Sequence, residues 1–400
     1  MYVPPVFPEL VPNNKDILEN FLEWRRHSFP FFERKTFLTH ASVSPLPAHT
    51  RQALQDYAAH LADYGQFDAY SDTYYFRCKE RVAALLCENK APATPQEIAF
   101  AGSTSHALGL VATSIDWKSG ENCVVADGDF PANVVTWKNL QHTHGVETRL
   151  IPYRPHMDLT LDDIKPLVDE KTRIVSLASC NFLSGCPLDL KEIGTWLHER
   201  GVLLCVDAIQ TLGAVRCDFS EADFVCADSH KWLLGPNGIA LLWTRGEVLK
   251  TLRPMVFGWL AGQNRDNWFS YDTTPIESAE RFEPGARNYL GIAAFDASLE
   301  VLHNADPNIV ENRVVQLRHF AAQKLVERGF HVLWQGDSNA KTGIVSFQAE
   351  SESATLQLYK RLDENFTLSL RSDKAGRSWI RISSHFMNCE EDINALASVL

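Results

Sequence analysis

Several features that would place this chain in a membrane, a secretory route or a dinucleotide-binding class are missing from the sequence. No apolar run approaches the roughly 18–20 residues that a membrane-spanning helix needs. The first residues, Met1 to Pro5, lack the basic region and apolar stretch of a signal peptide. No Gly-x-Gly-x-x-Gly follows a predicted strand, which disfavours a nicotinamide-dinucleotide site. We therefore expect a cytoplasmic protein without a membrane partner.

Positive charge and paired cysteines are also scarce. The formal net charge is -12 at pH 7, which disfavours nucleic acid and anionic membranes as partners. A small anion could still bind in a locally basic pocket. The cysteines number 9, and none forms a Cys-x-x-Cys pair. This argues against a zinc site or a disulfide framework, so we expect reduced thiols and no metal.

The order of apolar segments predicts an α/β fold. The chain has 400 residues, 45% of them hydrophobic, which is enough for a large core. The runs that predict strands are 97–101, 122–126, 147–152, 172–178, 202–206, 223–227 and 238–243. Stretches with helical spacing or length are 50–64, 73–88, 104–115, 131–142 and 189–200. Such alternation predicts a mostly parallel sheet covered on both faces, with ligands beyond the carboxyl ends of its strands.

The pattern changes beyond about residue 300. A long helix is expected at 310–328, followed by short strands and further helices up to the end of the chain. We predict a large domain over 36–295 and a smaller α+β domain over 296–400. The N-terminal segment 1–35 is expected to pack on the small domain.

Two residues at strand ends indicate the chemistry. Asp207 ends the apolar run 202–206, and Lys231 follows the run 223–227. A buried lysine amine can hold an aldehyde cofactor as a Schiff base. An aspartate can pair with a ring nitrogen and keep it protonated. Pyridoxal 5'-phosphate requires both groups, so the pair predicts an enzyme that uses this cofactor.

A phosphate cradle is predicted at 101–106. Gly102 allows close approach, Ser103 and Thr104 carry hydroxyls, and the start of a helix presents free N–H groups to an anion. The alternative interpretation is an ordinary helix N-cap without a ligand. The position of the segment ahead of Asp207 and Lys231 favours phosphate binding.

With these residues in place, the chain resembles the class V aminotransferase family of fold-type-I pyridoxal-phosphate enzymes. This family includes cysteine desulfurases, selenocysteine lyases, kynureninases, isopenicillin-N-epimerase-like proteins and C–S lyases. The matching stretches are 39–47, 102–104, 129–133, 181–185, 207–210, 229–236, 281–285 and 381–386. The resemblance implies a large domain with a mostly parallel, seven-stranded type of sheet, a smaller C-terminal α+β domain and a homodimer with its active site at the interface.

The resemblance also implies a role for each matching residue. Lys231 and Asp207 would be catalytic, holding the aldehyde and the pyridine nitrogen of the cofactor. Gln210 would reach the ring hydroxyl and Phe130 would stack on the ring. The phosphate would be held by Ser103, Thr104 and His230. The α-carboxylate of a small amino-acid substrate would be bound by Arg381, with Asn181 and His40 nearby.

Several positions depart from the desulfurase pattern. Phe130 stands where desulfurases carry a histidine, and the stretch 370–377 contains no persulfide-forming cysteine. Ala286 replaces a phosphate-binding threonine lent by the partner subunit in many relatives. Asp228 replaces a phosphate-binding serine and would repel the phosphate unless it is turned away.

These departures favour β-elimination of the C–S lyase type. The alternatives are an aminotransferase, an epimerase or cysteine desulfurase-type sulfur transfer. The sequence leaves the natural substrate and leaving group open. Three further arginines could contact a second acidic group on the substrate, although pairing with nearby acids or with solvent is the favoured interpretation: Arg287, Arg371 and Arg377.

Overall fold

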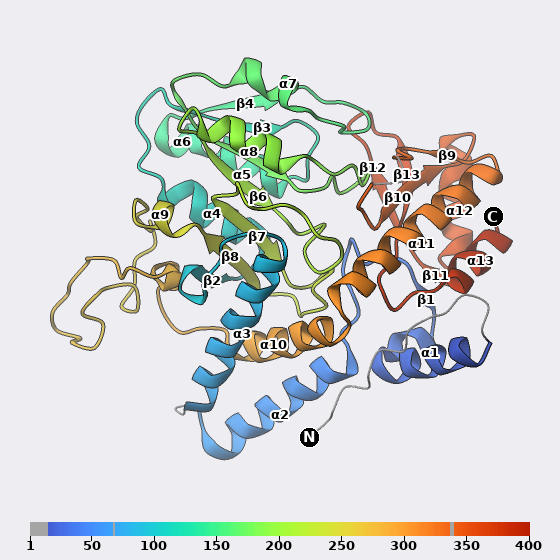
Figure 1. The fold of residues 1–400 in the computed structure, drawn as a ribbon, viewed down its shortest axis with the longest axis horizontal. Helices are drawn as coiled ribbons and strands as arrows, with labels where there is room; N and C mark the ends of the chain where they lie inside the picture. The colour runs from blue at the N-terminus through green and yellow to red at the C-terminus, as the bar shows by residue number, and fades with distance from the viewer. Residues whose placement is uncertain (1–14, 67–68, 337–339) are drawn as a thin grey trace.

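A seven-stranded sheet forms the centre of the larger part of the molecule (Figure 1). The computed structural model describes residues 15–66, 69–336 and 340–400. The strand order is β2-β8-β7-β6-β5-β3-β4. The strands are β2 (Ile98–Ala101), β3 (Asn122–Ala126), β4 (Glu147–Ile151), β5 (Thr172–Ala178), β6 (Leu203–Asp207), β7 (Phe224–Asp228) and β8 (Ala240–Thr244). The predicted sheet and fold class are confirmed.

Only β8 runs against its neighbours, pairing antiparallel with both β7 and β2. The connection from β7 to β8 covers residues 229–239 and contains no helix. A parallel pair needs a crossover of about a dozen or more residues, usually helical, so a connection this short returns the chain in the opposite direction. This connection carries Lys231, and the reversal keeps it beside the carboxyl end of β7.

The sheet is buried on both faces. Val124, Val206 and Val225 belong to one apolar cluster, while their chain neighbours Cys123 and Cys205 belong to the other. This alternation follows from the period of two along a strand. All nine cysteines are free. Six of the eight in the part of the chain around this sheet are buried as small apolar groups: Cys78, Cys123, Cys180, Cys186, Cys205 and Cys226.

Helices cover both faces. On one side lie α4 (Thr104–Ser114), α5 (Ala132–Lys138) and α6 (Leu140–His144); on the other lie α3 (Ala69–Glu88), α8 (Leu190–His198) and α10 (Tyr289–Asn304). The helix predicted at 131–142 is divided into α5 and α6 at Asn139. The shorter helices of this part are α7 (Leu161–Ile164) and α9 (Gly246–Leu249).

The sequence analysis did not predict α10. This helix packs against α3 and α2 (Ala48–Tyr64), and its residues are buried along most of its length. A helix that is apolar on nearly all sides lacks the one-sided pattern by which surface helices are recognised. The predicted boundary at 295–296 falls inside α10. A division near the end of the helix fits the structure better, and the division itself stays a prediction.

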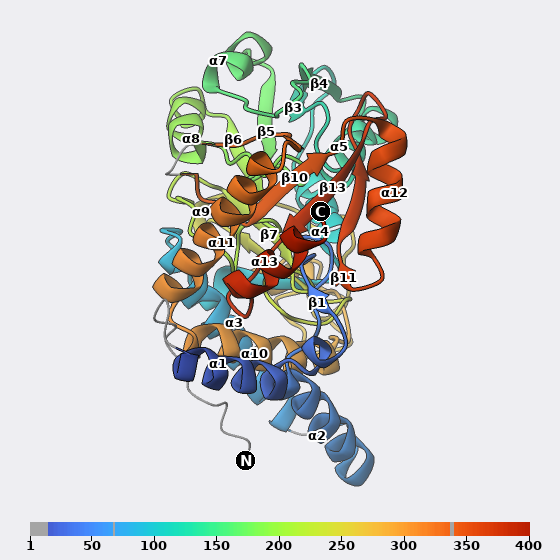
Figure 2. The ribbon, with the colours of Figure 1, turned by 90° about the vertical axis from the view of Figure 1, so that its right-hand side faces the viewer.

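A four-stranded antiparallel sheet with the order β12-β13-β10-β9 forms the centre of the C-terminal part (Figure 2). Its strands are β9 (His331–Val332), β10 (Ile344–Gln348), β12 (Ser369–Ser372) and β13 (Ser378–Ser383). The helices α11 (Pro307–Glu327), α12 (Glu352–Leu362) and α13 (Glu390–Ser398) pack with it through one apolar cluster.

The N-terminal segment lies against the C-terminal part. Strand β1 (Thr36–Phe37) pairs in parallel with β11 (Phe366–Thr367). In α1 (Lys15–Ser28), Arg25 donates to Asp392 at 2.7 Å. The packing predicted for 1–35 is therefore consistent with the contacts of 15–35, while residues 1–14 lie outside the described part of the chain.

Candidate functional site

A cavity of about 230 Å³ lies at the carboxyl ends of β6 and β7, where α4 begins. The predicted site residues that line it are Ser103, Thr104, Phe130, Asp207, Gln210, His230, Lys231 and Arg381. Segments far apart in the sequence thus converge on the edge of the sheet where α/β folds bind ligands.

Lys231 supplies a buried amine. Its side chain is 8% exposed and faces the ring of Phe130, with Nζ 5.5 Å from the ring centroid. Burial, aided by the charge of Arg381, lowers the pKa of Lys231 to about 8, although Asp207 and Asp228 act in the opposite direction. A larger fraction of the amine is therefore unprotonated near neutral pH, as a nucleophile or base requires.

Asp207 is the last residue of β6 and is buried. Its Oδ1 accepts a hydrogen bond from the amide of Ile209 at 3.0 Å. Burial and then the neighbouring carboxylate of Asp129 raise the pKa of Asp207 to about 7. Two buried acids close together favour a cation beside them. A protonated ring nitrogen meets that requirement.

Gln210 has a fixed orientation. Its Nε2 donates to the carbonyl oxygen of Ala41 at 3.2 Å, and its Oε1 accepts from the indole Nε1 of Trp232 at 3.1 Å. Because an indole N–H only donates, it requires the carboxamide oxygen on its own side. The NH2 group keeps a second hydrogen that Ala41 does not use.

The start of α4 forms the predicted cradle. Ser103 is the N-cap, and its hydroxyl accepts from the amide of His106 at 3.1 Å. The hydroxyl of Thr104 accepts from the amide of Asp228 at 2.9 Å, so its own hydrogen stays available to a phosphate. Both the cap and the cradle interpretations fit Ser103, which also lines the cavity.

Asp228 lines the cavity. Its Oδ1 lies 2.7 Å from Nδ1 of His230. This contact directs Nε2, on the other side of the ring, away from the carboxylate. The imidazole thus contacts the carboxylate of Asp228, whose negative charge would otherwise repel a phosphate.

Phe130 presents an exposed ring. Its side chain is 44% exposed, and its ring packs edge-on against Phe182 with centroids 5.4 Å apart. An aromatic face open to the cavity beside Lys231 fits a flat ring stacked upon it. The ring has no proton to donate.

Arg381 lies in β13 and reaches the cavity wall. It donates to the carbonyl oxygen of Phe182 at 2.5 Å and to the hydroxyl of Ser42 at 2.6 Å. Burial, and then the charge of Arg371, lower its pKa to about 9. A buried guanidinium with neutral partners fits a carboxylate supplied by a ligand.

Asn181 and His40 lie outside the lining of this cavity. Oδ1 of Asn181 accepts from the amides of Leu183 and Ser184 at 3.0 and 2.9 Å, while its Nδ2 is buried without a hydrogen-bond partner. His40 is fully buried, with Nδ1 2.8 Å from the hydroxyl of Ser44. Both side chains thus hold residues of their own loops, and direct substrate contact by them stays a prediction.

The arginines set aside in the sequence analysis have different positions. Arg287 pairs with Glu283 at 2.5 Å, and Arg377 pairs with Asp373 at 2.7 Å, as the favoured interpretation had it. Arg371 instead lines the cavity beside Ser42, which was also missed. The hairpin that brings Arg371 to the wall has a register that no local motif signals.

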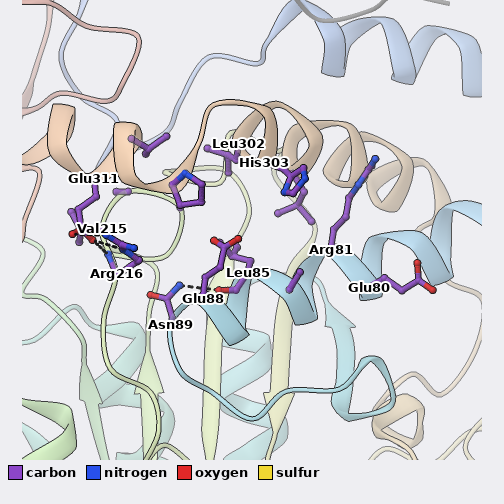
Figure 3. A pocket seen from close by; sticks show the side chains of 16 residues that line it. Glu80, Arg81, Leu85, Glu88, Asn89, Val215, Arg216, Leu302, His303 and Glu311 are labelled. Carbon is purple, nitrogen blue, oxygen red and sulfur yellow. Dashed lines mark hydrogen bonds and ion pairs between the residues drawn. The ribbon is translucent and has the colours of Figure 1, made fainter. Parts of the chain in front are cut away.

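A larger cavity, of about 340 Å³, lies between α3, α10, α11 and the loop 213–216 (Figure 3). Its wall is largely apolar, and both arginines that line it are paired with acidic side chains. Arg216 is bonded to Glu311 at 3.1 Å, and Arg81 to Glu300 at 3.1 Å. Among the described residues, no lysine lines this cavity, so it offers no amine to an aldehyde cofactor.

The smaller cavity fits pyridoxal phosphate. A buried amine with a lowered pKa, a buried carboxyl group with a raised pKa, an open aromatic face and a helix start with two hydroxyls match the aldehyde, the ring nitrogen, the ring and the phosphate. Together with the sheet topology, these features define a fold-type-I pyridoxal-phosphate enzyme.

Comparison with known proteins identifies the family. The sequence profile of "Aminotransferase class-V" matches residues 36–396, so the chain belongs to the class V aminotransferase family. Its cofactor is pyridoxal 5'-phosphate.

Similar proteins match along nearly the whole chain. The uncharacterized aminotransferase YcbU of Bacillus subtilis is 27% identical, covering 94% of this chain and 96% of that protein. A probable cysteine desulfurase of Methanothermobacter thermautotrophicus is 26% identical, with the same coverage of 94% and 96%.

Solved structures share the fold. A variant of C-DES with glycine covalently linked to its PLP cofactor has a TM-score of 0.84 at 22% identity, covering 93% of this chain and 98% of that one. The same protein, described as a cystine C–S lyase in complex with its product cysteine persulfide, has a TM-score of 0.83 at 22% identity, covering 92% and 98%. Among the described residues, no helix is long and apolar enough to cross a membrane.

Proposed function

We propose that this enzyme catalyses β-elimination from a small amino acid that carries a sulfur-linked or related leaving group on Cβ. One observation carries the proposal: among the described residues, Lys231 and Arg381 line the cavity and no cysteine does. The likeness to C-DES, itself a cystine C–S lyase, supports the same direction.

The roles of the residues follow from their environments. When bound, the cofactor supplies an electron sink that stabilises negative charge at Cα. Asp207 would keep the ring nitrogen protonated, and Arg381 would hold the α-carboxylate. Lys231, once its amine is released, would take the proton from Cα, because its lowered pKa suits a base near neutral pH.

Cysteine-based sulfur transfer has little support in the cavity wall. The cysteines beside the Asn181 segment, Cys180 and Cys186, are buried, and burial raises both thiol pKa values well above the usual range, that of Cys186 to about 12. The segment 373–377 is a tight turn, with Asp373 Oδ1 accepting from the amides of Ala375 and Arg377 at 2.9 and 3.0 Å. Neither place supplies a reactive thiolate.

Transamination and epimerisation remain the alternatives with the same residues. Both reactions need Lys231 to take a proton from Cα. They differ in the atom that is then reprotonated, which is Cα itself in epimerisation and a cofactor carbon in transamination. Because Phe130 has no titratable group, Lys231 would carry out both transfers. The products distinguish these reactions from elimination.

The decisive assay measures pyruvate released from L-cysteine or L-cystine by the purified, cofactor-loaded protein without a keto-acid acceptor. We expect pyruvate to appear in step with released sulfur. Alanine with sulfur retained on the protein would establish a desulfurase instead. If neither substrate reacts, elimination from these compounds is refuted and amino-group transfer to a keto acid is the next assay.

Lys231→Ala provides the control. This variant is expected to lose both turnover and the mass of cofactor that borohydride fixes to the wild-type protein. A Lys231→Ala variant that still gains this mass would remove Lys231 from its proposed role.

We also propose that the enzyme is a homodimer in the cytoplasm. The segment between α9 and the turn 279–282 carries exposed apolar side chains that a single subunit leaves in water: Met255, Val256, Trp259, Trp268, Phe269 and Tyr271. Apolar patches of this kind mark interaction surfaces. Trp268→Asp is expected to shift the mass measured by light scattering towards the monomer, whereas Val326→Asp, on the exposed face of α11, leaves it unchanged.

A further inference from the structure

Two arginines approach the cavity from the same face of the C-terminal sheet. In the antiparallel pair β12–β13, Ser369 lies opposite Arg381 and Arg371 lies opposite Trp379. Because side chains alternate between faces with a period of two, Ser369, Arg371 and Arg381 share one face. Arg371 is therefore a diagonal neighbour of Arg381, and both line the cavity.

Both guanidinium groups converge on one hydroxyl. Nη2 of Arg371 donates to Ser42 Oγ at 2.9 Å, and Nη2 of Arg381 donates to the same atom at 2.6 Å. Their other contacts are neutral as well: Arg371 donates to its neighbouring carbonyl at Leu370, at 3.0 Å, and Arg381 to the carbonyl of Phe182. In the described part of the chain, neither forms an ion pair with a carboxylate.

Placing two like charges side by side without a counterion is costly. The cost is visible in the lowered pKa of Arg381, to which Arg371 contributes after burial. Arg287 and Arg377, by contrast, each have a carboxylate within hydrogen-bond distance. A substrate α-carboxylate supplies a single negative charge, which compensates one of the two cavity arginines.

The two arginines are not equivalent with respect to the reacting amine. Arg381 affects the pKa of Lys231 more strongly than Arg371 does. Arg381 is also buried in the wall, whereas Arg371 is only half-buried, so Arg371 lies nearer the open side of the cavity. Arg381 is thus the partner for the carboxylate next to Cα, and Arg371 is left for a group farther along the substrate.

We infer that Arg371 forms a subsite for a second anionic group, so that the preferred substrate is an amino acid with a carboxylate or similar acidic group on its side chain. This inference rests on the proposed function, in which Arg381 binds the α-carboxylate. It narrows the substrate class from small amino acids in general to acidic ones.

The test compares ligands that differ only in side-chain charge. L-Aspartate and L-glutamate are titrated against L-asparagine and L-glutamine, with L-alanine as the reference, and binding is followed by the absorbance of the bound cofactor. A charge-assisted hydrogen bond corresponds to about ten- to hundred-fold in affinity. At least one acid is expected to bind more tightly than its amide by this factor.

Arg371→Gln is expected to reduce the ratio of acid to amide affinity to near one, while Arg381→Gln weakens every amino acid. Arg377→Gln, the same substitution at an arginine paired with Asp373, is the control and keeps the wild-type ratio. Normal cofactor absorbance and circular dichroism verify the fold of each variant.

Two results would overturn the subsite alone: equal binding of acids and amides by the wild type, or an Arg371→Gln variant that weakens L-alanine as much as the acids. The second result would mean that both arginines hold the α-carboxylate. If no amino acid, L-alanine included, changes the cofactor absorbance, the proposed function fails and the subsite fails with it.

Discussion

Substitution of Gly343 tests how rigidly Trp232, which holds Gln210 in the cavity wall, is packed. A Cβ at this position would meet Cη2 of Trp232 at 2.4 Å and Cγ1 of Val314 at 2.8 Å. Trp232 is fully buried and bonded to Gln210, so its ring has little freedom to move aside. Gly343→Ala therefore forces one methyl group into filled space.

The expected cost follows from two opposing effects. Overpacking a core typically costs about 1–3 kcal/mol. Replacing glycine by alanine restricts the unfolded chain and returns about 0.4–1 kcal/mol. We expect Gly343→Ala to lower the free energy of unfolding by about 1–2 kcal/mol.

The matched control is Gly109→Ala in the middle of α4, where a Cβ meets nothing within 4 Å. There the same substitution is expected to raise the free energy of unfolding by about 0.5–1 kcal/mol. Urea unfolding of the two variants, followed by circular dichroism, measures both signs in one experiment. A Gly343→Ala protein as stable as Gly109→Ala would refute the rigid packing of Trp232.

The remaining predictions concern the site and its supports. Trp232→Phe removes the donor to Gln210 and is expected to lower stability by about 1–3 kcal/mol, measured by urea unfolding, and to move the pH at which the bound cofactor changes its absorbance. Asp207→Asn is expected to retain cofactor but lose about 10²–10³-fold in turnover, and an undiminished rate would remove Asp207 from the mechanism. Burial lowers the pKa of His385 to about 4, so below its unfolded value of about 6.5 the unfolded chain binds the proton more readily. The neutral, buried imidazole therefore adds to the free energy of unfolding at any pH above about 6.5, and this added stability is lost as the pH falls towards 4. Unfolding curves at pH 7 and 5 measure the loss of stability, which is expected to be smaller in His385→Gln.

The sequence predicts the position of a residue well when that residue ends or follows a strand. It predicts poorly the roles that arise from packing between segments far apart in the chain. Asp207 and Lys231 could be placed because each follows an apolar run that becomes a buried strand. The role of Arg371 depends on the register of a hairpin, and the bond from Trp232 to Gln210 depends on how two loops pack. Neither leaves a local pattern in the chain.

The same distinction applies to His40 and Asn181. Both stand in matching motifs, neither lines the cavity, and their contact with a substrate stays a prediction. Membership in a conspicuous segment does not say which side chain of the segment faces the ligand. The helix α10 was missed for the opposite reason, since a helix buried on most sides has no contrasting polar face.

The long sequence separation between residues of the cavity wall determines when during synthesis the enzyme can become active. Ser42 meets Arg381 across 339 residues of sequence, and Ala41 receives Gln210 from 169 residues away. The wall of the cavity therefore joins a segment that leaves the ribosome early to one that leaves it late. Contacts of such long range form slowly. A nascent chain can assemble the central sheet, but it cannot bind substrate until its final strands have been made.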